Sequence, residues 1–335
     1  MTNSLGEHSA MISPEDRAKL ESLQALMKPE SDLDPDAKRW LTESCLCRYL
    51  RARNWDVKKA SEMLHQSLEW RRRVGPDKIT WEEVCKEAAT GKMYICPYPD
   101  KLGRTILMMK PGRENTKGHD GQIKHLVYVL EAAVRQNAVR SDFNEPPRGS
   151  DADLSPEQIC LVIDYKGWSL FNAPPIKTSK ETLNILQNQY PERLGVAILY
   201  DPPSLFSTLW AMLTPFMDVK TASKVKFLTQ KKARATLIEY ADLSQLERSV
   251  GGDFEYEFDF QAYGRRMTDL QNEAKQNMQS VELSATNASE YHQQQEQSAP
   301  PPAEGVNSEA EGVYSGPEGV NAGPQLVTES LHEPQ

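Results

Sequence analysis

The sequence predicts an α/β protein with a helical N-terminal unit followed by a mostly parallel β-sheet that helices cover. Helical periodicity without strand-like runs occupies residues 13–90. After residue 91, short apolar runs typical of buried strands alternate with helical segments, as they do where helices connect parallel strands. We therefore expect four parts in order: a disordered N-terminus (1–12), a helical unit (13–90), an α/β unit (91–265) and a disordered tail (266–335).

The helical unit has clear start and stop signals. Ser13 and Pro14 form a suitable helix start, because Ser caps well and Pro fits the first position. Residues 57–70 have the apolar spacing of an amphipathic helix and are followed by three arginines, which suit a helix C-terminus.

The α/β unit is predicted from apolar runs and helical periodicity. The expected strands are 105–109, 159–163, 194–200 and 225–229, and the expected helices between them are 123–139 and 178–189. The strand–helix alternation favours parallel pairing between successive strands.

Charge and cysteine content exclude several classes of protein. The net charge is −9, but residues 269–335 carry 11 acidic residues and one basic residue, so the rest of the chain is almost neutral. This balance does not fit a nucleic-acid-binding protein. The five cysteines are odd in number and lack metal-ligand spacing, which favours reduced thiols and no metal site. No run has the layout of a signal peptide or the length of a membrane span, so we expect a cytoplasmic protein.

The segment between Asp201 and Asp218 contains no charged residue. Apolar residues recur there at helical spacing around well over half of the circumference: Leu205, Phe206, Leu209, Trp210, Leu213 and Phe216. From periodicity alone, a buried core helix is the favoured interpretation. A helix that covers an apolar ligand is the alternative.

An ordered series of short motifs over about residues 40–260 resembles the CRAL-TRIO lipid-transfer family. The motifs are RARNWDV (51–57) with WRR (70–72), DKLGR (100–104), IDYKG (163–167), YPERLG (190–195) and TASK (221–224). Each motif alone is weak, but their order and spacing together are specific.

The resemblance implies an apolar lipid cavity with the sheet as its floor and a gating helix at 203–216. In members that bind phosphatidylinositol, the matches of Arg53, Glu192, Thr221 and Lys224 gather around the inositol phosphate. We add Arg193, the neighbour of Glu192, to the predicted headgroup residues. Arg and Lys suit a phosphate, and Glu suits inositol hydroxyls. Without the resemblance, an ion pair between Glu192 and Arg193 and a solvated Lys224 would be preferred.

Two departures from the family pattern affect the expected ligand. A basic residue often follows the match of Arg53, but this chain has Asn54. The positions that bind phosphatidylcholine in other members are apolar or thiol residues here: Cys96, Leu107, Ile159 and Leu161. We therefore expect poor use of phosphatidylcholine, and a sterol or another weakly polar lipid as the second ligand.

The predicted function is non-enzymatic lipid binding and transfer, in which phosphatidylinositol is extracted from membranes and exchanged or presented. Two alternatives stay open: a lipid-regulated adaptor or sensor, and a carrier of a sterol or other hydrophobic molecule. Expected partners are phosphatidylinositol-containing membranes, contacted peripherally and transiently, and a lipid kinase; the protein is expected to be a monomer without a cofactor other than bound lipid. His119, His125 and Asp164 lack any accompanying catalytic motif, so an enzyme is not expected.

Overall fold

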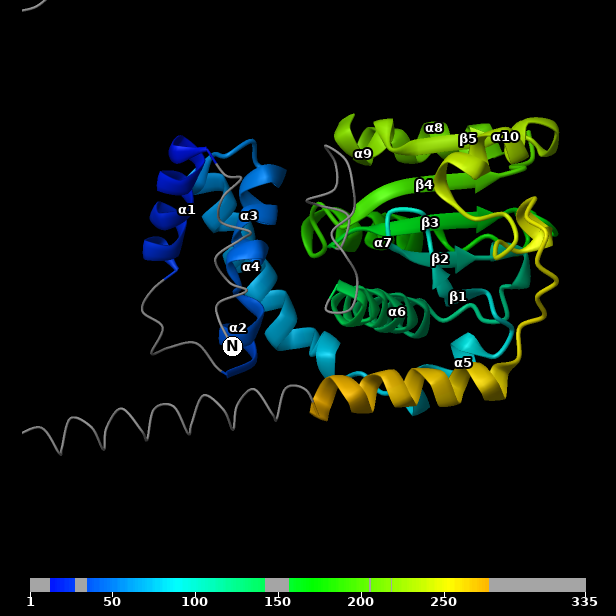
Figure 1. Ribbon diagram of the computed structural model, residues 1–335, viewed down its shortest axis with the longest axis horizontal. Coiled ribbons are helices and arrows are strands. Elements are labelled where there is room, and N and C mark those ends of the chain that lie inside the picture. The colour runs from blue at the N-terminus through cyan, green and yellow to red at the C-terminus, as the bar shows by residue number, and fades with distance from the viewer. Residues whose placement is uncertain (1–12, 28–34, 142–156, 205, 218, 277–335) are drawn as a thin grey trace, which may run out of the picture. The chain divides into compact units, whose positions relative to one another are not determined.

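The computed structural model describes residues 13–27, 35–141, 157–204, 206–217 and 219–276 (Figure 1). The predicted disorder at 1–12 and over most of the tail, 277–335, falls outside these residues. The named helices are α1 (Pro14–Leu26), α2 (Pro35–Trp40), α3 (Glu43–Ala52), α4 (Val57–Val74), α5 (Trp81–Ala88), α6 (His119–Ser141), α7 (Ile176–Asn188), α8 (Phe206–Leu213), α9 (Val219–Ser223) and α10 (Gln230–Tyr240).

Helices α1, α3 and α4 form an apolar core of their own. It consists of residues at helical spacing, among them Leu20, Leu23, Leu46, Tyr49, Leu50, Met63, Leu64 and Leu68. The start of α1 is capped as the sequence predicts, because the Ser13 hydroxyl accepts a hydrogen bond from the Asp16 N–H at 3.1 Å. Helix α4 ends at Gly75, whose φ of 59° is in the left-handed region that favours glycine.

A five-stranded sheet forms the second part, in the order β1-β2-β3-β4-β5. Its strands are β1 (Met93–Pro99), β2 (Thr105–Met109), β3 (Ile159–Asp164), β4 (Leu194–Tyr200) and β5 (Val225–Leu228). β1 pairs antiparallel with β2, and all later pairs are parallel. The predicted α/β class with a mostly parallel sheet is confirmed, and the four predicted strands are present.

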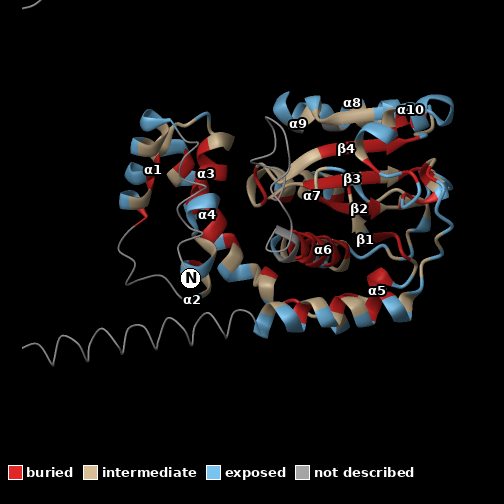
Figure 2. Cartoon of the chain, viewed as in Figure 1, coloured by how far each residue is buried: buried red, intermediate tan, exposed pale blue. Residues whose placement is uncertain are grey.

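Both faces of the central strands β2, β3 and β4 are largely buried, as expected for parallel strands between helices. Alternate residues of β3 and β4 enter different apolar clusters. Cys160, Val162 and Ile198 belong to the larger cluster, whereas Ala197 and Leu199 pack in a smaller cluster with Phe206 of α8. Figure 2 shows β2, β3, β4 and α6 as largely buried elements.

Strand β1 is absent from the predicted elements. It contains Pro97 and Pro99, which lack the N–H group that a central strand needs. The structure places it at the edge of the sheet, where only one side needs backbone partners. Helix α5 also differs from the expected division at residue 90, because Val84 packs in the core of the sheet.

The predicted tail boundary at residue 266 requires correction. Residues 260–276 form a helix that continues past this boundary. Tyr263 and Met267 are buried in the core of the sheet, and the Arg266 guanidinium donates to the carbonyl oxygens of Ile95 and Cys96, both at 3.0 Å. Composition indicated disorder here because polar residues outnumber apolar ones, whereas two buried side chains and bonds to the edge strand fix the helix.

Candidate functional site

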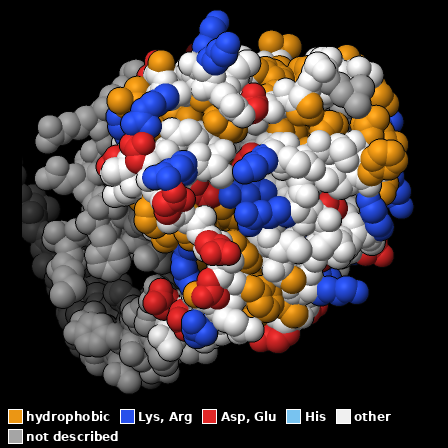
Figure 3. All heavy atoms as spheres, turned by 90° about the vertical axis from the view of Figure 1, so that its right-hand side faces the viewer, with side chains coloured by type: hydrophobic (Ala, Val, Ile, Leu, Met, Phe, Trp, Pro, Cys, Tyr) orange, Lys and Arg blue, Asp and Glu red, His pale blue; other side chains and the backbone are white. Residues whose placement is uncertain are grey.

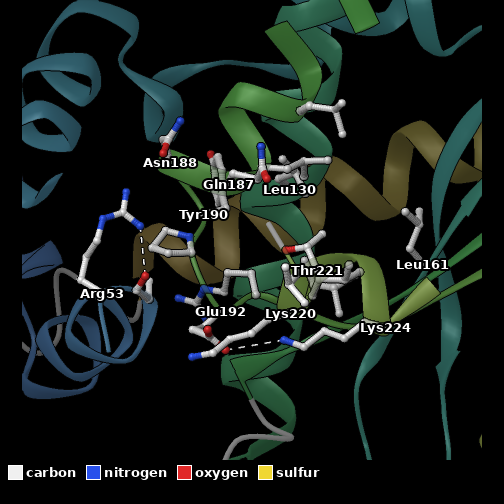
Figure 4. Close-up of a pocket in the computed structure, with 18 of the residues that line it drawn as sticks. Arg53, Leu130, Leu161, Gln187, Asn188, Tyr190, Glu192, Lys220, Thr221 and Lys224 are labelled. Atoms are coloured by element: carbon white, nitrogen blue, oxygen red, sulfur yellow. Dashed lines mark hydrogen bonds and ion pairs between the residues drawn. The ribbon is translucent and has the colours of Figure 1, made fainter. Parts of the chain in front are cut away.

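A pocket of about 500 Å³ is formed where the end of α3, the sheet, α7 and α9 meet. Its apolar wall consists of Leu107, Leu130, Ile159, Leu161, Leu183, Leu186, Leu194 and Val219. Its polar lining includes Arg53, Asn54, Gln187, Asn188, Glu192, Arg193, Lys220, Thr221 and Lys224 (Figure 4). The pocket therefore combines a largely apolar wall with a basic polar lining, which suits an amphipathic ligand with an anionic group.

Arg53 is supplied by the turn that follows α3. It is the C-cap residue of that helix, and its Nη1 donates to the Ala52 carbonyl oxygen at 3.0 Å. The next two residues, Asn54 and Trp55, both have positive φ values, of 51° and 60°. Asn tolerates this conformation better than most residues, so the backbone gives a physical reason for Asn54 in this motif.

The turn before β4 supplies Glu192 and Arg193. Glu192 has a φ of 58°, which is uncommon for a residue with a side chain and indicates local strain. Its carboxylate lies 3.5 Å from the Lys224 ammonium group. The described residues show no ion pair between Glu192 and Arg193, so the predicted alternative of such a pair is wrong.

Arg193 points its guanidinium toward the segment before β3. Its Nη1 donates to the Glu157 carbonyl oxygen at 2.9 Å, and the carboxylate of Glu157 binds Arg48 at 2.7 Å and Arg51 at 3.4 Å. Burial, with the nearby charge of Arg48, lowers the pKa of Arg193 to about 10. Arg193 thus lines the pocket and also ties β4 to the residue that anchors two arginines of α3.

Helix α9 and the residue after it supply three polar side chains. Lys220 donates from Nζ to the Arg51 carbonyl oxygen at 3.2 Å, which connects α9 with the end of α3. The Lys224 N–H donates to the Thr221 carbonyl oxygen at 3.2 Å, and the Lys224 carbonyl oxygen accepts from Ala197 of β4 at 3.0 Å. The Lys224 side chain is only 25% exposed, so it is not the solvated lysine of the alternative interpretation.

All five predicted headgroup residues line this one pocket. They come from the turn after α3, the turn before β4, and α9 with the residue after it, which lie far apart in the sequence. Gln187, Asn188 and Lys220 also line the pocket, and they were not among the predicted site residues. Gln187 and Asn188 lie three and two residues before the YPERLG motif, and this position was the one signal in the sequence that could have indicated them.

Three of the four positions expected to exclude phosphatidylcholine also lie on the pocket wall. Leu107 of β2 is paired in register with Leu161 of β3, and Ile159 lies at the start of the same strand. Cys96 is fully buried in β1 and does not line the pocket; burial raises the pKa of its thiol to about 12.

The predicted gating helix corresponds to α8. Phe206 is buried against Tyr165, with ring centroids 4.6 Å apart, and Trp210 packs edge-on against Phe227 at 5.1 Å. Neither of these two residues lines the pocket. Leu205 and the side chains of Leu209, Leu213 and Phe216 lie outside the described part of the chain, so the gate stays a prediction.

The ranges that the structure describes contain neither a metal site nor a membrane-spanning helix. Among those residues, no group of three or more His, Cys, Asp and Glu side chains is placed to hold a metal ion. No helix within the same ranges has the length and apolar content needed to cross a membrane.

Comparison with known proteins defines the class. Residues 19–66 match the CRAL/TRIO N-terminal domain, and residues 88–252 match the CRAL/TRIO domain. The crystal structure of Sfh5 has a similar fold, with a TM-score of 0.53 and 15% identity over 78% of this chain and 92% of that chain. The chain belongs to the CRAL/TRIO family of lipid-binding and lipid-transfer proteins.

Particular relatives are 30–34% identical to this chain over the residues that align. A CRAL-TRIO domain-containing protein of Schizosaccharomyces pombe is 34% identical over 72% of this chain and 22% of its own length. The phosphatidylinositol transfer protein PDR17 of Saccharomyces cerevisiae is 30% identical over 70% of this chain and 64% of its own length. A SEC14 cytosolic factor of Candida glabrata is 30% identical over 73% of this chain and 82% of its own length. The match therefore covers less than two thirds of the first two relatives.

Proposed function

We propose that the protein binds phosphatidylinositol in this pocket and transfers it between membranes or presents it, without catalysing a reaction. The observation that carries the proposal is the meeting of Arg53, Lys220 and Lys224 at one pocket with a largely apolar wall. Cationic side chains offer charge-assisted hydrogen bonds to a phosphodiester, and the apolar wall suits acyl chains.

The charge of the lining favours an anionic headgroup. Four basic side chains and one carboxylate, that of Glu192, line the pocket. No carboxylate lies within ion-pair distance of Arg53 or Lys220 among the residues that the structure describes. The 3.5 Å pair between Glu192 and Lys224 is long for a hydrogen bond, so both groups can turn to a ligand. Glu192 would then accept from inositol hydroxyls while Lys224 donates to the phosphate.

The apolar wall argues against phosphatidylcholine. Leu107, Ile159 and Leu161 offer no hydrogen-bond donor to the phosphate of a phosphatidylcholine headgroup. Each hydrogen bond left unmade on a buried polar group costs about 1–3 kcal/mol, and more on a charged one. A second ligand of low polarity, such as a sterol, is the favoured partner in an exchange.

The cellular setting of the proposal follows from the same properties. The protein would act from the cytoplasm, touch membranes transiently and hand its lipid to another membrane or to a lipid kinase. The similarity to PDR17, whose name describes a phosphatidylinositol transfer protein, supports this proposal. A regulatory role, in which the bound lipid alters a protein partner, would use the same pocket.

The test is to purify the full-length chain and identify its bound and exchangeable lipids by mass spectrometry. We expect phosphatidylinositol on the wild type, and at least a tenfold loss of affinity in Lys224→Ala, because a hydrogen bond to a charged group contributes about 1.5–3 kcal/mol. Lys226→Ala is the matched control, since Lys226 lies two residues away and does not line the pocket. Equal phosphatidylinositol content in both variants would contradict the assigned phosphate site.

The same samples test the headgroup specificity. Transfer of phosphatidylinositol between vesicles should greatly exceed transfer of phosphatidylcholine. Efficient phosphatidylcholine transfer would show that the apolar wall does not discriminate. A sterol bound equally by the wild type and Lys224→Ala, with no phosphatidylinositol, would instead favour the sterol-carrier alternative.

A further inference from the structure

An exposed apolar turn follows β3 and is not part of the pocket. Phe171 is 94% exposed and Leu170 is 58% exposed, whereas Trp168, at the base of the turn, is buried. Single exposed apolar residues are common on protein surfaces, but the exposure of two adjacent large ones to water at the tip of a turn is energetically unfavourable. We therefore expect a binding partner or surface to cover these two side chains.

Hydrogen bonds hold this turn in one conformation. The Asn172 N–H donates to the Ser169 carbonyl oxygen at 3.2 Å, which closes a β-turn with Leu170 and Phe171 at its centre. The Asn172 side chain accepts from the Ser169 N–H at 2.7 Å and donates to the Gly167 carbonyl oxygen at 3.0 Å. The exposure of Leu170 and Phe171 is therefore set by a bonded turn and does not result from a loose loop.

The charges around the turn are basic. Lys117 donates from Nζ to the Phe171 carbonyl oxygen at 2.8 Å, so its ammonium group lies directly beside the tip. Lys166 and Lys177 flank the turn in sequence and are exposed, and residues 165–180 contain no acidic residue. The ammonium groups of these three lysines have no carboxylate partner within the described ranges, although the Lys166 backbone N–H donates to the Asp164 carboxylate at 3.0 Å. Figure 3 views the side toward which β3 and β4 point in Figure 1, and hydrophobic side chains gather there among Lys and Arg and also Asp and Glu.

We propose that the turn Ser169–Asn172 inserts Leu170 and Phe171 into a lipid bilayer whose surface carries anionic lipids. Apolar side chains next to lysines are the combination that binds the interface of such a membrane, because the rings enter the acyl region and the ammonium groups stay at the phosphates. Residues 165–180 contain lysines and no acidic residue, which favours this surface over a basic protein partner.

The position of the turn links membrane contact to the predicted gate. Trp168 packs edge-on against Phe206, the first residue of α8, with ring centroids 6.1 Å apart. Tyr165 contacts both of these rings. Trp168, at the base of the turn, thus connects the inserted tip with the start of α8. This docking role does not depend on which headgroup the pocket holds.

The experiment measures the partition of the full-length protein onto vesicles of phosphatidylcholine with and without phosphatidylserine. Phe171→Ser should lower the partition coefficient at least tenfold, given the transfer free energy of a large apolar side chain. Leu170→Ser should also weaken binding, whereas Leu26→Ser should not, although Leu26 on α1 is 55% exposed and of the same type. Phosphatidylserine should strengthen wild-type binding, and Lys166→Glu should reduce this gain.

Several results would overturn the proposal. Unchanged partition of Phe171→Ser would exclude insertion of the turn. A change in the sedimentation coefficient of Phe171→Ser without vesicles would show that the turn contacts a second copy of the chain instead. The lipid content of each purified variant separates this test from the proposed function. A wild type without phosphatidylinositol contradicts the headgroup assignment but leaves the comparison of vesicle binding valid.

Discussion

We propose that Lys220 supplies, in space, a cation that the sequence motif lacks at Asn54. The family pattern often has a basic residue after the match of Arg53, and this chain has Asn54 there. Lys220 lines the same pocket as Asn54, and its Nζ reaches the Arg51 carbonyl oxygen at 3.2 Å. The positive charge that the end of α3 lacks would then come from α9.

This substitution of one cation for another leads to a rescue experiment. Lys220→Gln should reduce the affinity for phosphatidylinositol about tenfold, because one charge-assisted hydrogen bond is lost. Adding Asn54→Arg to Lys220→Gln should restore much of the affinity, measured by lipid exchange. Lys226→Gln serves as the control.

The rescue has a known structural cost. Asn54 has a φ of 51°, and a residue other than Gly, Asn or Asp in this region costs roughly 1–2 kcal/mol of stability. The melting temperature of each variant must therefore be measured beside its affinity. No loss of affinity in a folded Lys220→Gln protein would contradict the role of Lys220.

At the scale of elements, helix α6 packs against β1 and β2 of the sheet and contains a buried histidine. Both ring nitrogens of His125 are buried without a hydrogen-bond partner in the described structure. Burial, with the nearby positive charge of Lys92, lowers the pKa of His125 from 6.5 to about 3. The ammonium group of Lys92 is in turn held by Glu87 and Glu114. A neutral, enclosed imidazole has no access to a ligand, so His125 has no place in the pocket chemistry.

His125→Leu should stabilise the protein and change its pH dependence. Replacing an unsatisfied buried polar group with an apolar one of similar size removes a desolvation cost of about 1–3 kcal/mol. Between pH 6.5 and about 3, the unfolded wild type binds a proton at His125 that the folded protein does not bind, so wild-type stability falls as the pH falls. The variant lacks this contribution.

Urea unfolding above and below pH 6.5 measures the effect. The stability difference between His125→Leu and the wild type should grow at the lower pH. His65→Gln, at an exposed histidine on α4, is the control. A constant difference across this pH range would show that His125 does not titrate as its burial implies.

At the scale of the whole molecule, the helix at 260–276 determines where the folded part ends. Its buried Met267 and the bonds from Arg266 to β1 hold the edge strand of the sheet. A chain ending at residue 265 should lose at least about 3 kcal/mol of unfolding free energy, since deleting a buried Met side chain alone costs about 2–5 kcal/mol.

A chain ending at residue 276 is the matched control for this truncation. It keeps every contact of the helix that the structure describes and should retain wild-type stability and lipid transfer. Thermal unfolding of both truncated chains gives the comparison. Equal melting temperatures would show that the helix contributes little, and loss of transfer in the longer chain would favour a regulatory role for residues 277–335.

The sequence alone determined the elements whose signals are local. The strands β2 and β4 have the predicted limits, because apolar runs bounded by turn residues need no knowledge of their neighbours. The edge strand β1 and the helix at 260–276 were not predicted, because prolines and polar residues hide them locally. Their stability comes from long-range contacts that periodicity cannot report.

The candidate site was likewise predicted in part from the sequence and decided in part by the tertiary structure. The motif resemblance named Arg53, Glu192, Thr221 and Lys224, but only the tertiary structure brought them to one pocket with Lys220. Sequence neighbours suggested a pair between Glu192 and Arg193. The left-handed backbone at Glu192 and the bond from Arg193 to Glu157 give Glu192 a different partner, Lys224. The sequence gives the type and order of the site residues. Which side chains face one another depends on the crossover connections and on packing between distant segments.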